Sequence, residues 1–141
     1  MTATIFDPLS HLLLLEGCGA SLLPRDTQAW RRVNRGNGRV FGVKQAVDPA
    51  DLHPDQWEMH PHGDELLLLI DGVIDLITSD GRNEQRQLLQ KGQAVLIRQG
   101  TWHRLLLLAP STLAFLSPVR GTRRHPLGKP WPAMAPAARK R

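Results

Sequence analysis

Carboxylates and imidazoles gather in two short segments of the chain, residues 58–65 and 92–103. The residues that could bind a metal ion are Glu58, His60, His62, Glu65 and His103. Glycines at turn positions punctuate both segments, so the two groups belong to separate strands. Carboxylate oxygens and imidazole nitrogens together suit a divalent metal ion. The pattern predicts a metal site inside a small β-barrel, where neighbouring strands direct ligands toward one point.

The elements that must position these residues are short strands. Residues 37–118 show strand signals at roughly ten-residue spacing, separated by turn residues such as Ser79-Asp80-Gly81, which is typical of a sandwich or barrel. The predicted strands are Arg39–Val47, Trp57–His60, Glu65–Ile70, Val73–Thr78, Glu84–Leu89, Ala94–Arg98, Trp102–Leu108 and Thr112–Ser117. The chain of 141 residues is therefore expected to form one β domain.

Two flanking segments differ from this middle region. In residues 1–36 a short helix could open at Pro8 and Ala20–Leu23 could be a strand, and we expect this segment to pack on the barrel or on a partner. Residues 119–141 form a basic tail rich in proline and alanine, which excludes regular helix or an interior strand. All thirteen acidic residues precede residue 85, so the net charge of +5 is a property of the tail. No helix-turn-helix pattern or zinc knuckle accompanies it, and nucleic-acid binding is not expected.

Cysteine content and hydropathy bear on location. Cys18 is the only cysteine, so no disulfide can form within the chain, which is typical of a reducing compartment. No apolar run approaches the ~18 residues that a membrane-spanning helix requires. The sequence therefore predicts a cytoplasmic protein without a membrane segment.

Two leucine runs, Leu66–Leu69 and Leu105–Leu108, are apolar at every position. In an antiparallel sheet one face normally meets water and carries polar side chains. The runs indicate that the outer face is covered, either by the N-terminal segment or by a second subunit, and we favour a homodimer. The alternative is an ordinary barrel with a leucine-rich composition.

Between Val40 and Val119 the sequence resembles the cupin superfamily. The first cupin motif has His-x-His, three or four residues, Glu, six residues and Gly, and its second half matches Glu65 to Gly72. The second motif has Gly, five residues, Pro, one residue, Gly, two residues, His, three residues and Asn. It matches Gly92, Gly100 and His103 in order and spacing, with Arg98 in place of Pro and Leu107 in place of Asn. The resemblance implies an all-β, double-stranded β-helix (jelly-roll) barrel.

The first half of the first motif leaves two registers open. The pair His60 and His62 stands one residue too close to Glu65 for the family spacing, whereas Glu58 and His60 leave the four residues that it permits. Ligands two apart also share the inward face of a strand, and residues 61–64 read as a turn. The preferred metal ligands are therefore Glu58, His60, Glu65 and His103, with His62 in reserve.

This ligand set suits Fe, Mn, Zn or Ni as a divalent ion. Two inward carboxylates would repel each other without a cation, which favours occupancy. Replacement of the first family histidine by Glu58 leaves weak or vestigial binding as the alternative. The sequence names neither the ion nor the ligand of the cavity.

The strand phases predict a mostly apolar cavity around the site. Its expected lining is Leu67, Leu69, Leu105 and Leu107, with Phe41, Val43 and Val47 on the facing strand. Trp57 and Trp102 fall on the opposite phase and should pack outside. Lys and Arg are absent from the inward phase of the ligand-bearing strands near the metal, so an acidic substrate would lack an obvious salt-bridge partner apart from the ion itself or Arg98.

Two functions follow from the resemblance, because cupins include both enzymes and binding domains. One is an enzyme of dioxygenase or isomerase type that acts on a small organic molecule at a divalent metal ion. The other is a non-catalytic small-molecule-binding or sensor barrel with a weak or vestigial metal site. The residues leave the choice between catalysis and binding open.

Overall fold

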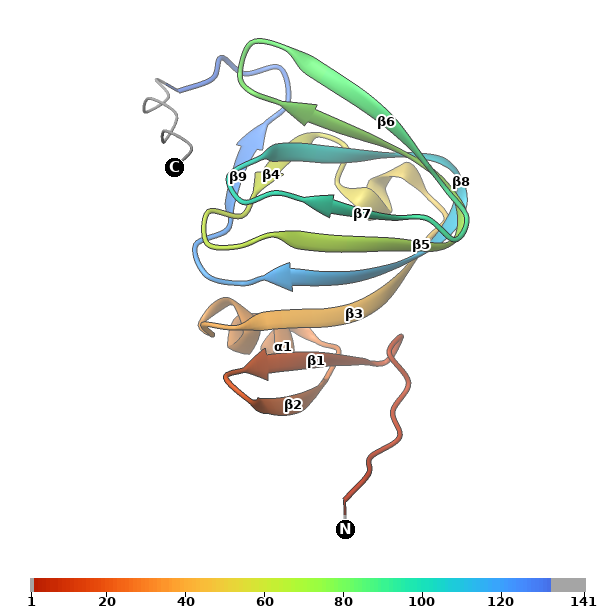
Figure 1. The fold of residues 1–141 in the computed structure, drawn as a ribbon, viewed down its shortest axis with the longest axis vertical. Coiled ribbons are helices and arrows are strands. Elements are labelled where there is room, and N and C mark those ends of the chain that lie inside the picture. The colour runs from red at the N-terminus through yellow and green to blue at the C-terminus, as the bar shows by residue number, and fades with distance from the viewer. Residues whose placement is uncertain (1, 133–141) are drawn as a thin grey trace.

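The computed structural model describes residues 2–132, which are mainly antiparallel strands (Figure 1). The elements in chain order are β1 (His11–Glu16), β2 (Gly19–Pro24), α1 (Thr27–Asn34), β3 (Arg39–Ala46), a 3₁₀ turn (Pro49–Leu52), β4 (Gln56–Met59), β5 (Glu65–Ser79), β6 (Glu84–Gln90), β7 (Ala94–Ile97), β8 (Trp102–Pro118) and β9 (Arg123–Pro126). The expected all-β fold class is confirmed.

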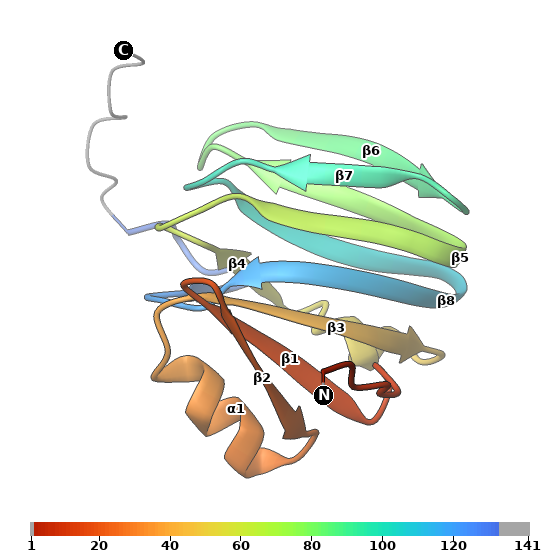
Figure 2. The same ribbon diagram turned by 60° about the horizontal axis from the view of Figure 1, so that its bottom comes forward.

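The long strands β5 and β8 pair with each other along most of their lengths and belong to both halves of the fold. The start of β5 and the end of β8 lie in one sheet with β7 and β3. The end of β5 and the start of β8 lie in the other with β6 and β4, and β9 extends it. This arrangement is the predicted jelly roll, and Figure 2 shows the strands curving around a common interior.

The bend in β5 explains why the sequence predicts two strands where the structure has one. Register shifts between Leu69 and Ile74 interrupt the pairing with β8 without ending the strand. Gly72 lies in this bend with φ of 103°, and a Cβ there would lie 2.0 Å from the hydroxyl oxygen of Ser111. Only glycine fits both the backbone conformation and the close approach. The final residue of the first motif therefore bends the strand.

The N-terminal segment is more regular than the sequence indicates. Residues 8–10 form a turn, so the helix expected at Pro8 is wrong, whereas the strand expected at Ala20–Leu23 is present as most of β2. The hairpin of β1 and β2 extends the first sheet through pairing of β1 with β3. Asp26 caps α1 by accepting a hydrogen bond from the backbone N–H of Ala29. No helix of residues 2–132 has the length and apolarity to cross a membrane.

Leucines of β5 alternate between the interior and the outer surface. Leu67 and Leu69 belong to the main hydrophobic core with Ile74, Leu76, Leu89, Ile97 and Leu113. Leu66, Leu68 and Ile70 are 40%, 38% and 44% exposed on the opposite face. Neither the N-terminal hairpin nor any other described segment covers these outer leucines completely.

The described part of the basic tail contains a strand. Residues 123–126 form β9, which pairs with β4 at the edge of the second sheet. Pro126 ends this strand, and an edge position tolerates proline because one side of the strand needs no hydrogen bonds. The tail residues 133–141 lie outside the described part of the chain.

Candidate metal centre

Pairing of β4 with β8 places two of the predicted ligands opposite each other. Glu58 of β4 faces His103 of β8 directly in the register. His60 follows β4 two residues after Glu58 and therefore shares its inward face. Glu65 opens β5 and is 5% exposed. Four side chains from three neighbouring strands therefore converge on the interior.

Hydrogen bonds join the turn after β4 to the turn before β8. The backbone N–H of Gly100 donates to the carbonyl of His60 at 2.9 Å. The backbone N–H of Gln99 donates to the Asp64 carboxylate at 2.8 Å, and its side chain donates to the carbonyl of Pro61 at 2.7 Å. These bonds fix the 61–64 turn against the 98–100 turn, so the two motifs of the sequence hold each other in place.

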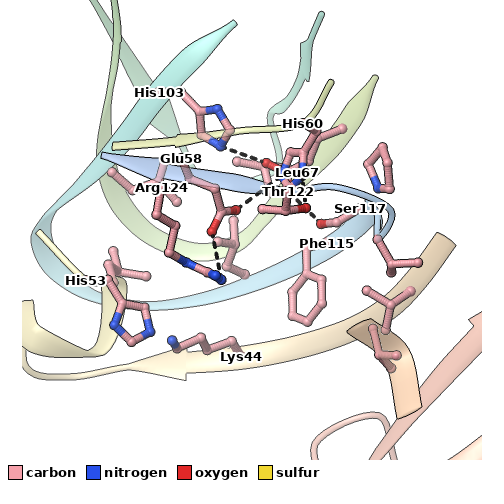
Figure 3. A pocket seen from close by; sticks show the side chains of 18 of the residues that line it. Lys44, His53, Glu58, His60, Leu67, His103, Phe115, Ser117, Thr122 and Arg124 are labelled. Carbon is pink, nitrogen blue, oxygen red and sulfur yellow. Dashed lines mark hydrogen bonds and ion pairs between the residues drawn. The ribbon is translucent and has the colours of Figure 1, made fainter. Parts of the chain in front are cut away.

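The carboxylates and imidazoles lie within hydrogen-bonding distance (Figure 3). Nε2 of His60 is 3.1 Å from a Glu58 carboxylate oxygen and 3.0 Å from Glu65 Oε2. Nε2 of His103 is 3.1 Å from Glu65 Oε1. One donor atom from each of the four residues lies within 4.8 Å of all the others. His62 is exposed and lies outside this group.

Further contacts orient the ligand side chains. Nδ1 of His103 is 3.1 Å from the carbonyl oxygen of Thr101, which can only accept, so Nδ1 carries the proton. Nδ1 of His60 is 2.9 Å from the Thr122 hydroxyl, and the Ser117 hydroxyl donates to Glu65. Such contacts to the far side of ligating residues fix ring orientation in metal sites.

Burial and hydrogen bonding shift the pKa values in opposite directions. Burial favours neutral imidazole, but hydrogen bonds to Glu58 and Glu65 outweigh it and raise the pKa of His60 to about 9. Burial likewise opposes the charge of His103, yet Glu65 raises its pKa. Burial would raise the pKa of Glu58 and Glu65, whereas hydrogen bonds to the imidazoles lower both. Without a metal ion, the imidazoles and the carboxylates thus each favour the charged form of the other.

The donor set fits a divalent metal ion. When His103 is neutral, its proton stays on Nδ1 and the lone pair of Nε2 points toward Glu65. A cation shared by the Nε2 atoms and the carboxylate oxygens would supply the positive charge that the two carboxylates otherwise draw from the imidazoles. The buried donors of Glu65, His60 and His103 are thus oriented for coordination, and Glu58 lies at the more open side.

A cavity of about 480 Å³ opens beside the four residues. Leu67 and Leu105 line it as the sequence predicts, whereas Leu69 and Leu107 belong to the core and its packing. The predicted phase of β3 is wrong, because Val40 and Lys44 line the cavity in place of Phe41, Val43 and Val47. Apolar residues occur on both faces of this strand, so alternation alone did not define its inward side.

The sequence did not predict the positively charged side chains that line the cavity. Lys44 of β3 and Arg124 of β9 line it, and a guanidinium nitrogen of Arg124 is 3.3 Å from Glu58 Oε2. Arg98, which the sequence left open as a partner for an acidic substrate, pairs with Asp64 at 3.3 Å and does not line the cavity. Glu58 and Arg124 are opposite each other in the pairing of β4 with β9, and the sequence alone does not reveal this pairing.

The outer face of the same strands carries an aromatic cluster. Trp57, Met59, Ile77 and Trp102 pack together with Leu106 and Trp131. The His125 ring stacks on Trp131 with 4.4 Å between centroids. The predicted outward packing of Trp57 and Trp102 is confirmed. His125 of β9 and Trp131 after it contribute two further rings that no sequence pattern indicated.

Comparisons with known proteins give matches only among solved structures. No family model matches the chain, and no curated protein matches it. A cupin-2 domain protein of Shewanella frigidimarina is 19% identical with a TM-score of 0.45, covering 60% of this chain and 74% of its own. A protein of Neisseria meningitidis is 15% identical with a TM-score of 0.45, covering 60% and 78%.

A hydroxypropylphosphonic acid epoxidase of S. wedmorenis is also similar, at 18% identity and a TM-score of 0.43. The match covers 57% of this chain and 42% of the epoxidase. Within the present chain, the bent β5 and β8, the strand pairing and the placement of both glycine-punctuated motifs all agree with the predicted architecture. The protein therefore has the antiparallel jelly-roll barrel fold that the sequence predicts.

Proposed function

We propose that this protein binds a divalent transition-metal ion through Glu58, His60, Glu65 and His103. The observation that carries the proposal is the meeting of four donor atoms within 4.8 Å on three strands. The carbonyl of Thr101 supports it by holding the His103 proton on Nδ1, which leaves Nε2 for coordination. Iron, manganese, zinc and nickel all suit two imidazoles and two carboxylates.

A small organic molecule would bind in the adjoining cavity, whose volume falls within the ~300–1,000 Å³ range of ligand pockets. The bound ion would supply Lewis-acid or redox chemistry at the donor cluster. Glu58 is the most exposed of the four residues, with a side chain 34% exposed. It could hold the ion or accept a proton from a bound molecule, which suits an isomerase- or dioxygenase-type reaction.

Metal analysis tests this proposal directly. Protein purified without a metal-affinity tag should contain about one transition-metal ion per chain, measured by elemental analysis. After chelation, one equivalent of Zn²⁺ should restore that content. A protein that neither contains nor takes up an ion would contradict the proposal.

A second function is favoured by the hydrogen bonding of the cluster. His60 already contacts both carboxylates, His103 contacts Glu65, and Arg124 pairs with Glu58. A network satisfied in this way needs no ion for stability. It would suit a non-catalytic small-molecule-binding or sensor barrel with a weak metal site. Oxygen uptake and substrate loss with panels of catechols, keto acids and sugars distinguish turnover from binding.

A homodimer is our proposal for the outer leucines. Leu66 pairs with Leu96 in the sheet register, and the two side chains are 40% and 45% exposed. A second copy of the chain would remove this surface from water. Light scattering should give twice the chain mass, and Leu68→Lys should give a monomer. A monomeric wild-type protein at micromolar concentration would contradict the dimer.

We also propose a cytoplasmic location, because the single cysteine, Cys18, is unpaired.

A further inference from the structure

The cavity wall opposite the imidazoles carries a cation that no described residue neutralises. Lys44 is half-buried in β3 and lines the cavity. Its ammonium has no hydrogen bond or ion pair with any residue between 2 and 132 in the structure, although Asp51 and Glu58 act on it through space. In Figure 3, Lys44 and His53 lie on one side of the pocket and His60 and His103 on the other.

Three arginines of the described chain line the cavity with Lys44, namely Arg25, Arg104 and Arg124. Arg124 pairs with Glu58 at 3.3 Å. The Arg25 guanidinium donates to the backbone carbonyl of Val43 at 2.5 Å. Arg104 lies 5.1 Å from the centroid of the Trp57 ring, and its buried Nε has no hydrogen-bond partner among the described residues. Within residues 2–132, Lys44 differs from Arg25 and Arg124 in having no polar partner, and from Arg104 in having no aromatic ring beside its charge, so its ammonium is available to a bound molecule.

Partial burial destabilises the charged form of Lys44 and so strengthens its attraction to an anion. Loss of water around the ammonium lowers the pKa of Lys44, and the nearby Arg25 adds to the effect, while Asp51 and Glu58 oppose it. A partly desolvated cation gains more from an anionic partner than one surrounded by water. An anion bound to Lys44 would thus compensate for the hydration that the ammonium loses by burial.

Apolar side chains make up part of the cavity lining. They include Leu67, Leu105, Leu113 and Phe115. A molecule that satisfied both ends would carry an acidic group at one end, a short apolar body, and an oxygen atom at the other.

We propose that the cavity selects small organic anions, whose carboxylate or phosphonate binds Lys44 while a distal oxygen faces Glu58, His60, Glu65 and His103. This inference rests on the proposed function, because an ion at the cluster would receive the distal oxygen. It narrows the ligands of the cavity from small molecules in general to acids. Lys44 is then a specificity-determining residue and not a metal ligand.

The test compares acids with neutral molecules of the same shape. Ligand-observed NMR would be recorded with hydroxy and keto acids of two to six carbons, their primary amides and the matching phosphonates. Wild-type protein should bind its best acid or phosphonate at least tenfold more tightly than the amide. Lys44→Gln should reduce that ratio to nearly one, whereas Lys44→Arg should retain most of it because the charge remains. The carboxylate and phosphonate series then identify the acidic group.

Lys91→Gln is the matched control, since Lys91 is an exposed lysine outside the cavity that lies 3.8 Å from Asp71. It should leave the ratio unchanged. Equal binding of acids and amides, an acid preference that survives Lys44→Gln, or no binding of any acid at millimolar concentration would each overturn the inference.

Zinc-loaded and metal-free protein would be compared in parallel. Elemental analysis should show that Lys44→Gln retains the metal content of the wild type. Failure of the wild type to take up zinc refutes the proposed metal site, but the metal-free samples still measure the acid preference. Uptake of zinc without an acid preference refutes the selectivity alone.

Discussion

The inner and outer faces of β4 and β8 have opposite chemistry although they share the same backbone. Glu58 and His103 point inward to the polar cluster, and Trp57 and Trp102, their neighbours in sequence, point outward to the aromatic cluster. Because side chains alternate along a strand, one short segment builds both faces. The comparison shows that the outer face contributes buried aromatic packing while the inner face carries the candidate metal ligands.

The largest effect should come from the outer face. Trp102 is 7% exposed and packs on Trp131 with 5.2 Å between centroids. Trp102→Ala should lower the free energy of unfolding by about 3–5 kcal/mol, because the cavity left behind cannot collapse fully. Urea denaturation measures this change. Trp30→Ala on α1, where Trp30 is 37% exposed, is the control and should cost less.

The adjacent residue on the inner face should behave differently. His103→Ala removes an oriented ligand and should weaken zinc binding by at least ~100-fold, since ligands contribute more than the supporting contacts around them. Competition with a chelating dye measures the affinity. His62→Ala, which alters an exposed residue outside the cluster, should leave zinc affinity unchanged. Loss of zinc in His62→Ala but not in Glu58→Ala would contradict the proposed ligand set.

The inner face should also make the metal-free protein sensitive to alkaline pH. The pKa of His60 rises from an ordinary 6.5 to about 9 on folding, so its stabilisation is complete below pH 6.5 and declines as pH rises through 9. Between pH 7 and pH 9 the free energy of unfolding should fall by ~2 kcal/mol.

Zinc should abolish most of this dependence, because coordinated imidazole carries no proton on Nε2. The measurement is a set of urea titrations across this pH range with and without zinc. A metal-free protein whose stability is flat from pH 7 to pH 9 would contradict the hydrogen-bonded imidazolium.

The smallest effect should come from substitution of Thr122, which precedes β9 and contacts His60. Thr122 contacts Nδ1 of His60, so Thr122→Val should weaken zinc binding about tenfold with little change in unfolding. Zinc competition and urea denaturation measure the two quantities. Thr122→Ser keeps the hydroxyl and should restore the affinity, whereas equal affinity in Val and Ser variants would show that the contact does not orient the ring.

Much of the fold was predictable because turns and alternation are local. The eight predicted strands of residues 37–118 depend on signals between residues that neighbour one another in sequence, such as the turn Ser79-Asp80-Gly81 before β6. The sequence could not show that β5 continues through a bend, because Asp71-Gly72 has the composition of a turn whether the strand ends there or continues. The first strand, β1, was missed because its leucine run, Leu12–Leu15, has no period that favours a strand over a helix.

The sequence by itself determined which residues could bind an ion, because motif spacing and the two-residue period assign Glu58, His60, Glu65 and His103 to one face of neighbouring strands. Only the tertiary structure decided what surrounds them. Thr122 and Arg124 reach the site through pairing of β4 with β9, and Lys44 reaches it through the phase of β3. The physical reason is that pairing between distant strands depends on the packing of the whole chain, and a residue's local neighbours do not encode it.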